Sequence, residues 1–228
     1  MQTPAEVFAQ RGRTVTGAWI ERLDLRGGDL RGTHFAGARI HRVGLSEIQL
    51  ENAIFDGVEL LGCDLRQARL AGAEIRGGRL DTCDLSRAEG QGLRLVRTRL
   101  EECRLGGARL MGARMRGVAV QGGETSYLDL RKAVLLGSRF THPRLGGAQL
   151  MRVDLRGAFL SECEFKGANF YAADLRGAML LRCDLTEAVF NDADLTGAVL
   201  IDCTTTRTDW STARLPTAGD HAARQHGA

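Results

Sequence analysis

Large apolar side chains recur at every fifth position through most of the chain. From Ile20 to Leu200, 35 of the 37 positions in this register carry Leu, Ile, Phe, Met or Val, and only Gly90 and Thr125 depart from it. A helix places its apolar residues every 3.6 positions and a half-buried strand places them at every second position. A period of five therefore predicts neither an ordinary helix nor an ordinary strand.

The other positions of the five-residue unit indicate what it builds. Two positions before each apolar centre the side chain is small at 33 of 37 positions, the exceptions being Leu23, Ile48, Leu93 and Leu128. Two positions after the centre, 18 of 37 positions carry Gly, which readily adopts the positive φ that tight turns often need. Each unit therefore predicts a straight side followed by a corner. Four corners close a square coil of 20 residues, and such coils stack as parallel strands do.

The cysteines support the 20-residue coil. Their positions differ from one another by multiples of 20: Cys63, Cys83, Cys103, Cys163, Cys183 and Cys203. They are expected to form one inward column, interrupted by Gly123 and Pro143. No histidine shares this column and parallel Cβ directions suit disulfides poorly, so we interpret the thiols as small core hydrophobes rather than as a metal site.

Several units match a known family consensus. The segments "ADLRG", "ADLTG" and "GANFY" closely resemble the A(D/N)LXX unit of the pentapeptide repeat family. This resemblance covers roughly residues 18–204 and implies an all-β fold, a right-handed quadrilateral parallel β-helix of about nine coils. We expect three parts: an N-terminal cap over residues 1–17, the β-helix over 18–204, and a C-terminal capping or dimerisation segment with a flexible tail over 205–228. Trp210 and Leu215 keep the register, so a damaged coil is expected to continue to about residue 215.

The stretch "VQGGETSYLDLRK", residues 120–132, is the least regular part of the repeat. Thr125 replaces the central apolar residue, Gly123 the small one, and Leu128 is large for its position. This predicts either a local bulge or a projecting loop that touches a partner, for which Glu124 and Tyr127 are the candidate contacts.

Composition removes several classes of function. The formal net charge of +3 is too small to indicate nucleic-acid binding. The histidines have no metal-site spacing, and no motif for nucleophilic catalysis or phosphate binding appears in a suitable context. We therefore expect a non-enzymatic protein without a cofactor. No apolar run is long enough to span a membrane and "MQTPAEVFAQRGR" lacks a signal peptide's apolar run, which favours a cytoplasmic protein.

Charge and greasy side chains vary along the chain. Residues 65–118 carry net charge +6, and residues 153–202 carry net charge −5. The acidic segment supplies the candidate partner-binding residues Asp154, Glu164, Asp174, Asp184, Asp192 and Asp194. The candidate dimer interface consists of the outward apolar residues Phe159, Met179, Leu181, Val199 and Ile201, together with Trp210. Such a patch is either an interface or covered by the C-terminal tail.

Two functions remain open from the sequence. The quinolone-resistance branch of the family protects DNA gyrase; its members are dimers joined at their C-terminal ends and are thought to mimic duplex DNA. The resemblance therefore implies a DNA-mimic homodimer that protects gyrase or topoisomerase IV from inhibitors, in antibiotic resistance or self-immunity. The positive overall charge limits such mimicry to the acidic segment. The alternative is a generic protein-interaction scaffold with no topoisomerase partner.

Overall fold

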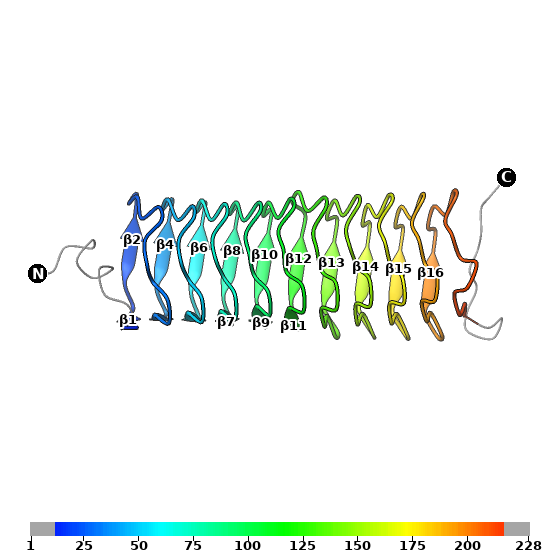
Figure 1. Cartoon of the computed structure of the whole chain (residues 1–228), viewed down its shortest axis with the longest axis horizontal. Coiled ribbons are helices and arrows are strands. Elements are labelled where there is room, and N and C mark those ends of the chain that lie inside the picture. The colour runs from blue at the N-terminus through cyan, green and yellow to red at the C-terminus, as the bar shows by residue number, and fades with distance from the viewer. Residues whose placement is uncertain (1–11, 217–228) are drawn as a thin grey trace, which may run out of the picture.

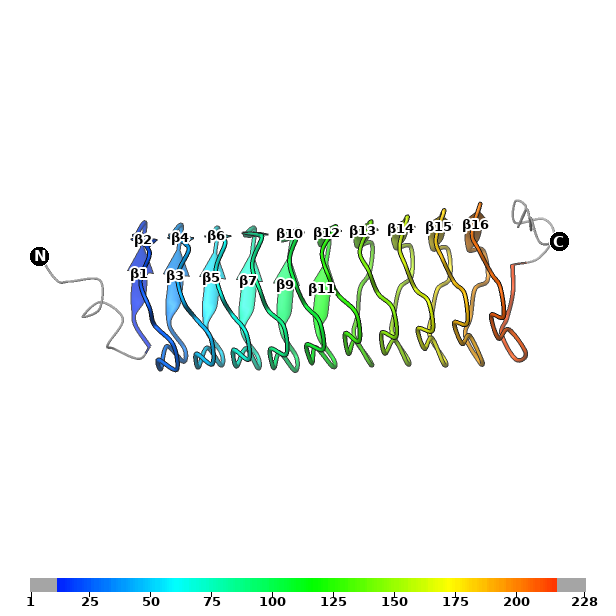
Figure 2. The same ribbon diagram turned by 90° about the horizontal axis from the view of Figure 1, so that it is seen from above.

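The computed structural model describes residues 12–216, which wind into a straight β-solenoid (Figures 1 and 2). All regular elements in this part of the chain are short strands and isolated bridges, and every strand pair is parallel. Each strand pairs with one 20 residues away, as Leu160 pairs with Leu180 and Leu180 with Leu200. Nine full turns therefore separate Ile20 from Leu200, which confirms the predicted all-β fold of about nine coils.

Each coil has four sides, which we call faces 1 to 4. Their central residues are Val15, Ile20, Leu25 and Leu30, respectively, and every twentieth residue after each of them. Faces 1 and 3 lie opposite each other, as do faces 2 and 4. The predicted placement of Leu175, Leu180, Leu185 and Phe190 on successive sides of one coil is confirmed by the bridges and strands on either side of each.

Two faces carry the strands, and the other two are held by isolated bridges. The six-stranded sheet on face 1 comprises β1 (Thr14–Thr16), β3 (His34–Ala36), β5 (Ile54–Asp56), β7 (Glu74–Arg76), β9 (Arg94–Val96) and β11 (Arg114–Arg116). The ten-stranded sheet on face 2 comprises β2 (Trp19–Glu21), β4 (Arg39–His41), β6 (Glu59–Leu61), β8 (Arg79–Asp81), β10 (Arg99–Glu101), β12 (Ala119–Gln121), β13 (Arg139–Thr141), β14 (Phe159–Ser161), β15 (Met179–Leu181) and β16 (Val199–Ile201).

Backbone hydrogen bonds tie each coil to both neighbours. The amide of Leu185 donates to Thr204 O at 2.8 Å, and that of Asp184 donates to Cys163 O at 3.0 Å. The corner residues hold positive φ even where they are not glycine, for example Arg182 at 51° and Glu187 at 58°. Left-handed backbone is unfavourable for such residues, so the stacked coils, rather than local preference, impose the corner.

The core is built from the central apolar column and the small column beside it. Alanines and cysteines of the small column lie fully buried against leucines and phenylalanines. Towards the C-terminus the rings of Phe170, Phe190 and Trp210 stack along face 4, with centroids 4.5 and 4.4 Å apart. Trp210 therefore points inward and continues the core, and the bridge between Asp194 and Arg214 extends the solenoid as far as predicted.

The cysteines form the predicted column on face 3. All six are free, five are buried, and Cys203 is half-buried. Their sulfur atoms lie near backbone carbonyls, as Cys183 Sγ lies 3.4 Å from Leu160 O. A hydrogen bond with Cys103, together with burial, raises the pKa of the Cys83 thiol to about 12. These thiols are therefore protonated at neutral pH and act as small packing groups.

The two gaps in the central column are filled by the two neighbouring large residues in the small column. A Cβ at Gly90 would lie 2.6 Å from Leu110 Cδ2 and 3.5 Å from Leu93 Cδ2, so Leu93 and Leu110 occupy the space a side chain would need. Thr125 and Leu128 repeat this arrangement one and three-quarter coils later, and both are buried. Exchanging a large and a small residue across a corner keeps the core volume nearly constant.

This exchange explains why residues 120–132 form neither a bulge nor a projecting loop. The five-residue register continues through β12 and through the bridges from Glu124 to Arg144 and from Asp129 to Gln149. The one local defect is a missing backbone bridge between Arg104 and Glu124 within the described part of face 3. It occurs at Gly123, whose φ is +86° and whose Cβ would lie 2.1 Å from Cys103 O.

The described ends of the solenoid bear on the expected domain boundaries. β1 and its central residue Val15, 5% exposed, lie inside the segment expected to be an N-terminal cap, so regular coils reach back to Thr14. Residues 1–11 and 217–228, where the rest of the cap and the flexible tail were expected, lie outside the described residues.

We expect Leu93→Ala to lower the free energy of unfolding by about 2–5 kcal/mol, because it opens a cavity beside Gly90. Gly90→Leu alone should also destabilise the protein, by about 1–3 kcal/mol, because Leu93 and Leu110 already fill that space. The double variant restores the usual large-then-small order and should be more stable than the sum of the two losses implies. Denaturant unfolding measures all three, and strictly additive losses would contradict the exchange of volume.

Candidate interaction surfaces

The solenoid offers surfaces rather than an enclosed site. Its internal voids, lined by core leucines, measure 10 to 20 Å³ and are too small for a ligand. A shallow groove of about 730 Å³ follows the corner between faces 3 and 4, where Glu47, Arg69, Arg87 and Glu89 make its charge alternate. Among residues 12–216 no cluster of His, Cys, Asp or Glu is placed to hold a metal ion, and no helix could cross a membrane.

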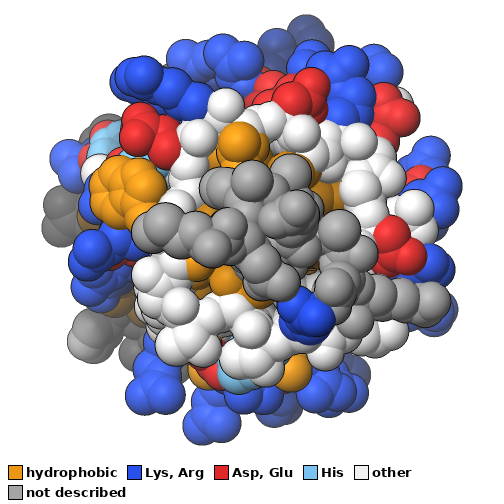
Figure 3. All heavy atoms as spheres, turned by 90° about the vertical axis from the view of Figure 1, so that its left-hand side faces the viewer, with side chains coloured by type: hydrophobic (Ala, Val, Ile, Leu, Met, Phe, Trp, Pro, Cys, Tyr) orange, Lys and Arg blue, Asp and Glu red, His pale blue; other side chains and the backbone are white. Residues whose placement is uncertain are grey.

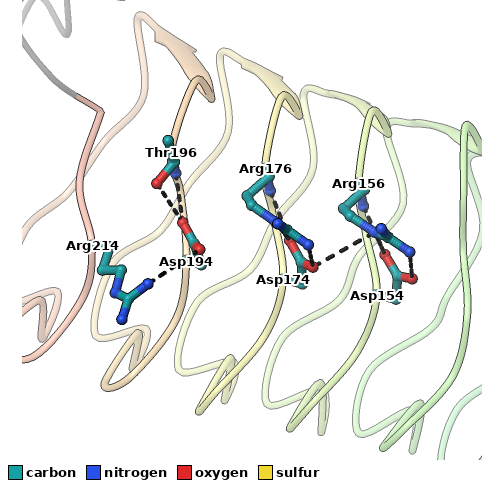
Figure 4. Close-up of polar contacts among 7 residues, drawn as sticks. All are labelled: Asp154, Arg156, Asp174, Arg176, Asp194, Thr196 and Arg214. Atoms are coloured by element: carbon teal, nitrogen blue, oxygen red, sulfur yellow. Dashed lines mark hydrogen bonds and ion pairs between the residues drawn. The ribbon is translucent and has the colours of Figure 1, made fainter.

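Three of the candidate acidic residues form a row on face 1 (Figure 4). Asp154, Asp174 and Asp194 are joined by parallel bridges and occupy the same position in consecutive coils. Arg176 donates to Asp174 from Nε at 2.8 Å and from Nη2 at 2.6 Å, and Arg156 makes the same two-pronged contact with Asp154.

The charge of this row is therefore largely neutralised. Arg156 Nε also lies 3.6 Å from Asp174 Oδ2 in the next coil, and Arg214 Nη1 lies 4.0 Å from Asp194 Oδ2. The hydrogen bond from Arg176 holds the pKa of Asp174 below its usual value, with smaller help from its backbone amide. Each such exposed pair adds little stability, but together they leave face 1 without excess negative charge at these coils.

The residual negative charge lies elsewhere. Glu164 and Asp184 occupy equivalent positions on face 3, opposite the row, and within the described chain neither has an ion-pair partner. Asp184 Oδ1 accepts only the Thr186 amide, at 2.9 Å. Asp192 lies at the corner between faces 4 and 1. The six candidate acids are thus spread over two opposite faces and a corner.

Glu124 and Tyr127 lie on face 3, in the coil two before Glu164. Glu124 accepts the Ser126 amide at 3.0 Å, which lowers the pKa of its carboxyl group, and it lies 3.8 Å from Arg144 Nη1. Tyr127 is 73% exposed and its ring lies over Gly147 of the next coil, where a Cβ would approach Cε1 to 2.8 Å. Both residues are accessible on the same side as Glu164 and Asp184.

The candidate dimer residues divide into two places. Phe159, Met179 and Val199 form one outward column on β14 to β16, and Leu181 and Ile201 form the column beside it. We call these five residues the apolar stripe; Met179 and Ile201 are 39% and 38% exposed. The stripe faces sideways on face 2, whereas Trp210 lies at the C-terminal end of the rod on face 4. An end-to-end contact would therefore bury Trp210 more directly than the stripe.

Comparison with known sequences and structures decides the family. The model of the family "Pentapeptide repeats" matches residues 21–57, 55–87, 126–157, 153–180 and 163–202, which is more than half of the chain. The chain belongs to the pentapeptide repeat family. A search of curated proteins finds no match to this pentapeptide repeat protein.

Solved structures support the fold. HetL, a pentapeptide repeat protein involved in heterocyst differentiation regulation from the cyanobacterium Nostoc sp. strain PCC 7120, is 20% identical. The match covers 97% of this chain and 100% of HetL with a TM-score of 0.55. QnrB1, a plasmid-mediated fluoroquinolone resistance protein, is 19% identical over 88% of this chain and 93% of its own, with a TM-score of 0.38.

One group of side chains was not singled out from the sequence. Five exposed arginines of the basic central segment lie together on face 1 and its corner with face 2: Arg94, Arg97, Arg99, Arg114 and Arg116. The net charge of +6 over residues 65–118 was a signal for them, but sorting by face was needed to show that they are neighbours. The view along the rod from the N-terminal side shows Lys and Arg side chains projecting around its rim (Figure 3).

Acid should weaken the face 1 ion pairs in a defined range of pH. Because the pKa of Asp174 is depressed by Arg176, the pair stabilises the fold above about pH 4, the usual Asp pKa, and this contribution is lost as the pH falls through the lower folded pKa. Asp174→Asn should therefore lower the thermal midpoint slightly and by a constant amount from pH 7 to 5. The difference should shrink in more acidic solution. In an Arg176→Gln background it should be much smaller at every pH; an unchanged difference would show that Arg176 is not its cause.

Proposed function

We propose that this pentapeptide repeat protein is a non-enzymatic rod that binds other proteins through side chains displayed on its faces. The observation that carries this proposal is the stacking of outward residues in straight columns, one residue every 20, around a filled core. Because adjacent coils lie about 4.8 Å apart, one partner can contact several coils without any change in the solenoid.

Within this class we propose a type II topoisomerase, DNA gyrase or topoisomerase IV, as the partner, which the rod would protect from inhibitors by mimicking DNA. The net charge of −5 over residues 153–202 supports this, because a DNA-binding surface attracts an acidic rod by charge complementarity. Since Asp154, Asp174 and Asp194 are largely neutralised, the effective contacts are the face 3 carboxylates Glu164 and Asp184, with Glu124 and Tyr127 on the same side.

We also propose a homodimer joined at the C-terminal end. There Trp210 is half-buried and stacks on Phe190 with one ring face, and Leu215 is 51% exposed. A second copy covering these residues would extend the core across a two-fold axis, with the apolar stripe at the edge of the contact. Such a dimer would place two acidic segments next to each other.

The topoisomerase proposal predicts that the wild-type protein raises the concentration of a gyrase poison needed to inhibit supercoiling. Replacing Glu164 and Asp184 by Lys should abolish this protection, and added salt should weaken it, because the contacts are exposed charges. The matched control exchanges Asp174 and Arg176, which alters face 1 without changing net charge, and should protect as the wild type does. If the wild type affects neither gyrase nor topoisomerase IV, the topoisomerase proposal is wrong and the general protein-binding rod remains.

The dimer proposal predicts twice the chain mass of 24.8 kDa in sedimentation equilibrium. Leu215→Asp should produce monomers because it places a charge in the end contact, and Met179→Asp with Ile201→Asp should weaken the dimer through its edge. Met111→Asp is the control, because Met111 is equally exposed but lies in the middle of the rod. Dimers that survive both the end and the stripe variants would rule out this interface.

A further inference from the structure

Five arginines form a compact cationic surface in the middle of the rod, which we call the arginine patch. Arg94 and Arg114 are directly opposite each other in the parallel pair β9 and β11. Arg116 follows on β11, Arg97 lies at the corner after β9, and Arg99 begins β10 on face 2. All five side chains are exposed.

The arginine patch lacks the internal neutralisation that the same positions have in other coils of face 1. In the coil of β7, Arg76 donates to Glu74 from Nε and Nη2, each at 2.7 Å, and Arg176 does the same to Asp174. In the coils of β9 and β11 the acidic position is taken by Arg94 and Arg114. Within the described chain, none of the five arginines has an ion-pair partner.

The neighbouring acids are already committed. Glu74 is bonded to Arg76, and Glu101, on the same strand as Arg99, accepts from Arg79 Nη2 at 2.7 Å. Like charges directly opposite each other in a sheet are destabilising. The free rod therefore holds a repulsive array that an anionic partner would relieve.

An apolar surface adjoins the arginine patch on the same face. Val134 and Leu136 occupy the two outward positions of the next coil, where Val134 is bridged to Arg114. Leu136 is 38% exposed, and Val96, between Arg94 and Arg97, is half-buried. Two cationic coils are thus followed directly by an apolar one.

We propose that the arginine patch and Leu136 together bind an acidic segment of another protein that also carries an apolar side chain. Arginine forks bind carboxylates in two-pronged contacts, and the coil spacing of about 4.8 Å allows adjacent carboxylates to be held at once. The apolar side chain would cover Leu136 and Val134. A phosphate backbone offers nothing for these two residues, and no aromatic side chain lies within the arginine patch to stack on bases, so the observations favour a protein. This surface has the opposite charge to the face 3 carboxylates and is independent of the topoisomerase proposal.

The test uses the full chain and three fluorescent probes in anisotropy titrations. The first is a 12-residue peptide of alternating Glu and Ser, the second is the same peptide with two central Ser residues replaced by Leu, and the third is a 12-base-pair DNA duplex. We expect the Leu peptide to bind about tenfold more tightly than the Ser peptide, the gain expected from burying one leucine at this partly covered surface.

Variants separate the charged and apolar contributions. Arg94→Glu with Arg114→Glu should weaken both peptides at least about tenfold, because two charge-assisted contacts are lost. Leu136→Ser should reduce the Leu peptide to the affinity of the Ser peptide and leave the latter unchanged. Arg69→Glu with Arg152→Glu makes the same change in net charge at exposed arginines outside the arginine patch and should have little effect. Denaturant unfolding confirms that each variant is folded.

Three outcomes would overturn the proposal. If the DNA duplex binds more tightly than either peptide and is insensitive to Leu136→Ser, the arginine patch is a nucleic-acid surface. If the control pair weakens binding as much as the patch pair, the attraction comes from net charge alone. If no probe binds even at low salt, the arginine patch does not recognise acidic segments.

Discussion

The whole structure depends on the backbone hydrogen bonds that join each residue to positions close to 20 residues away. Because these bonds run between coils, a slip of one residue would move a large side chain out of the core in every later coil. This explains why Leu, Phe and Ile hold the central column without a shift and why alanine or cysteine sits beside them. The same bonds force the corners into left-handed backbone, so that Arg182 and Glu187 take a conformation usually left to glycine. The strain at each corner is offset by the repetition of well-packed coils.

The register that organises the core also organises the surface. Identical positions lie directly above one another, so a repeated charge would repel itself along the whole rod. Face 1 avoids this where Asp154 and Asp174 each bind the arginine two residues on, because the pair is neutral within its own coil. Arg94 and Arg114 depart from this arrangement. A departure that destabilises the free rod, and lies next to exposed Leu136, is better explained by what the surface binds than by the fold.

Much of the fold was predictable because one interaction dominates it. The five-residue period, the Cys163 to Cys183 spacing and the continuation to Trp210 all follow from core packing, and each is confirmed. The irregular stretch was harder, because the side chain that fills the gap at Thr125 comes from Leu128 around the next corner. A position-by-position comparison with the repeat marks both as faults, whereas in three dimensions they compensate each other. The candidate acids were chosen by net charge along the chain, which does not show that arginines neutralise one face and leave Glu164 and Asp184 free on the other.

The separation of these surfaces limits how partners can bind. The arginine patch is on face 1, while Glu164 and Asp184 are on face 3, so a flat partner cannot contact both at once. Along face 1, Arg114 and Asp174 are three coils apart, about 14 Å at the spacing of parallel strands. That is close enough for one domain to span, but the paired Asp174 offers it little free charge. A protein bound to the arginine patch therefore leaves the acidic face open, and a rigid rod with two oppositely charged faces is suited to holding two different partners at a fixed distance.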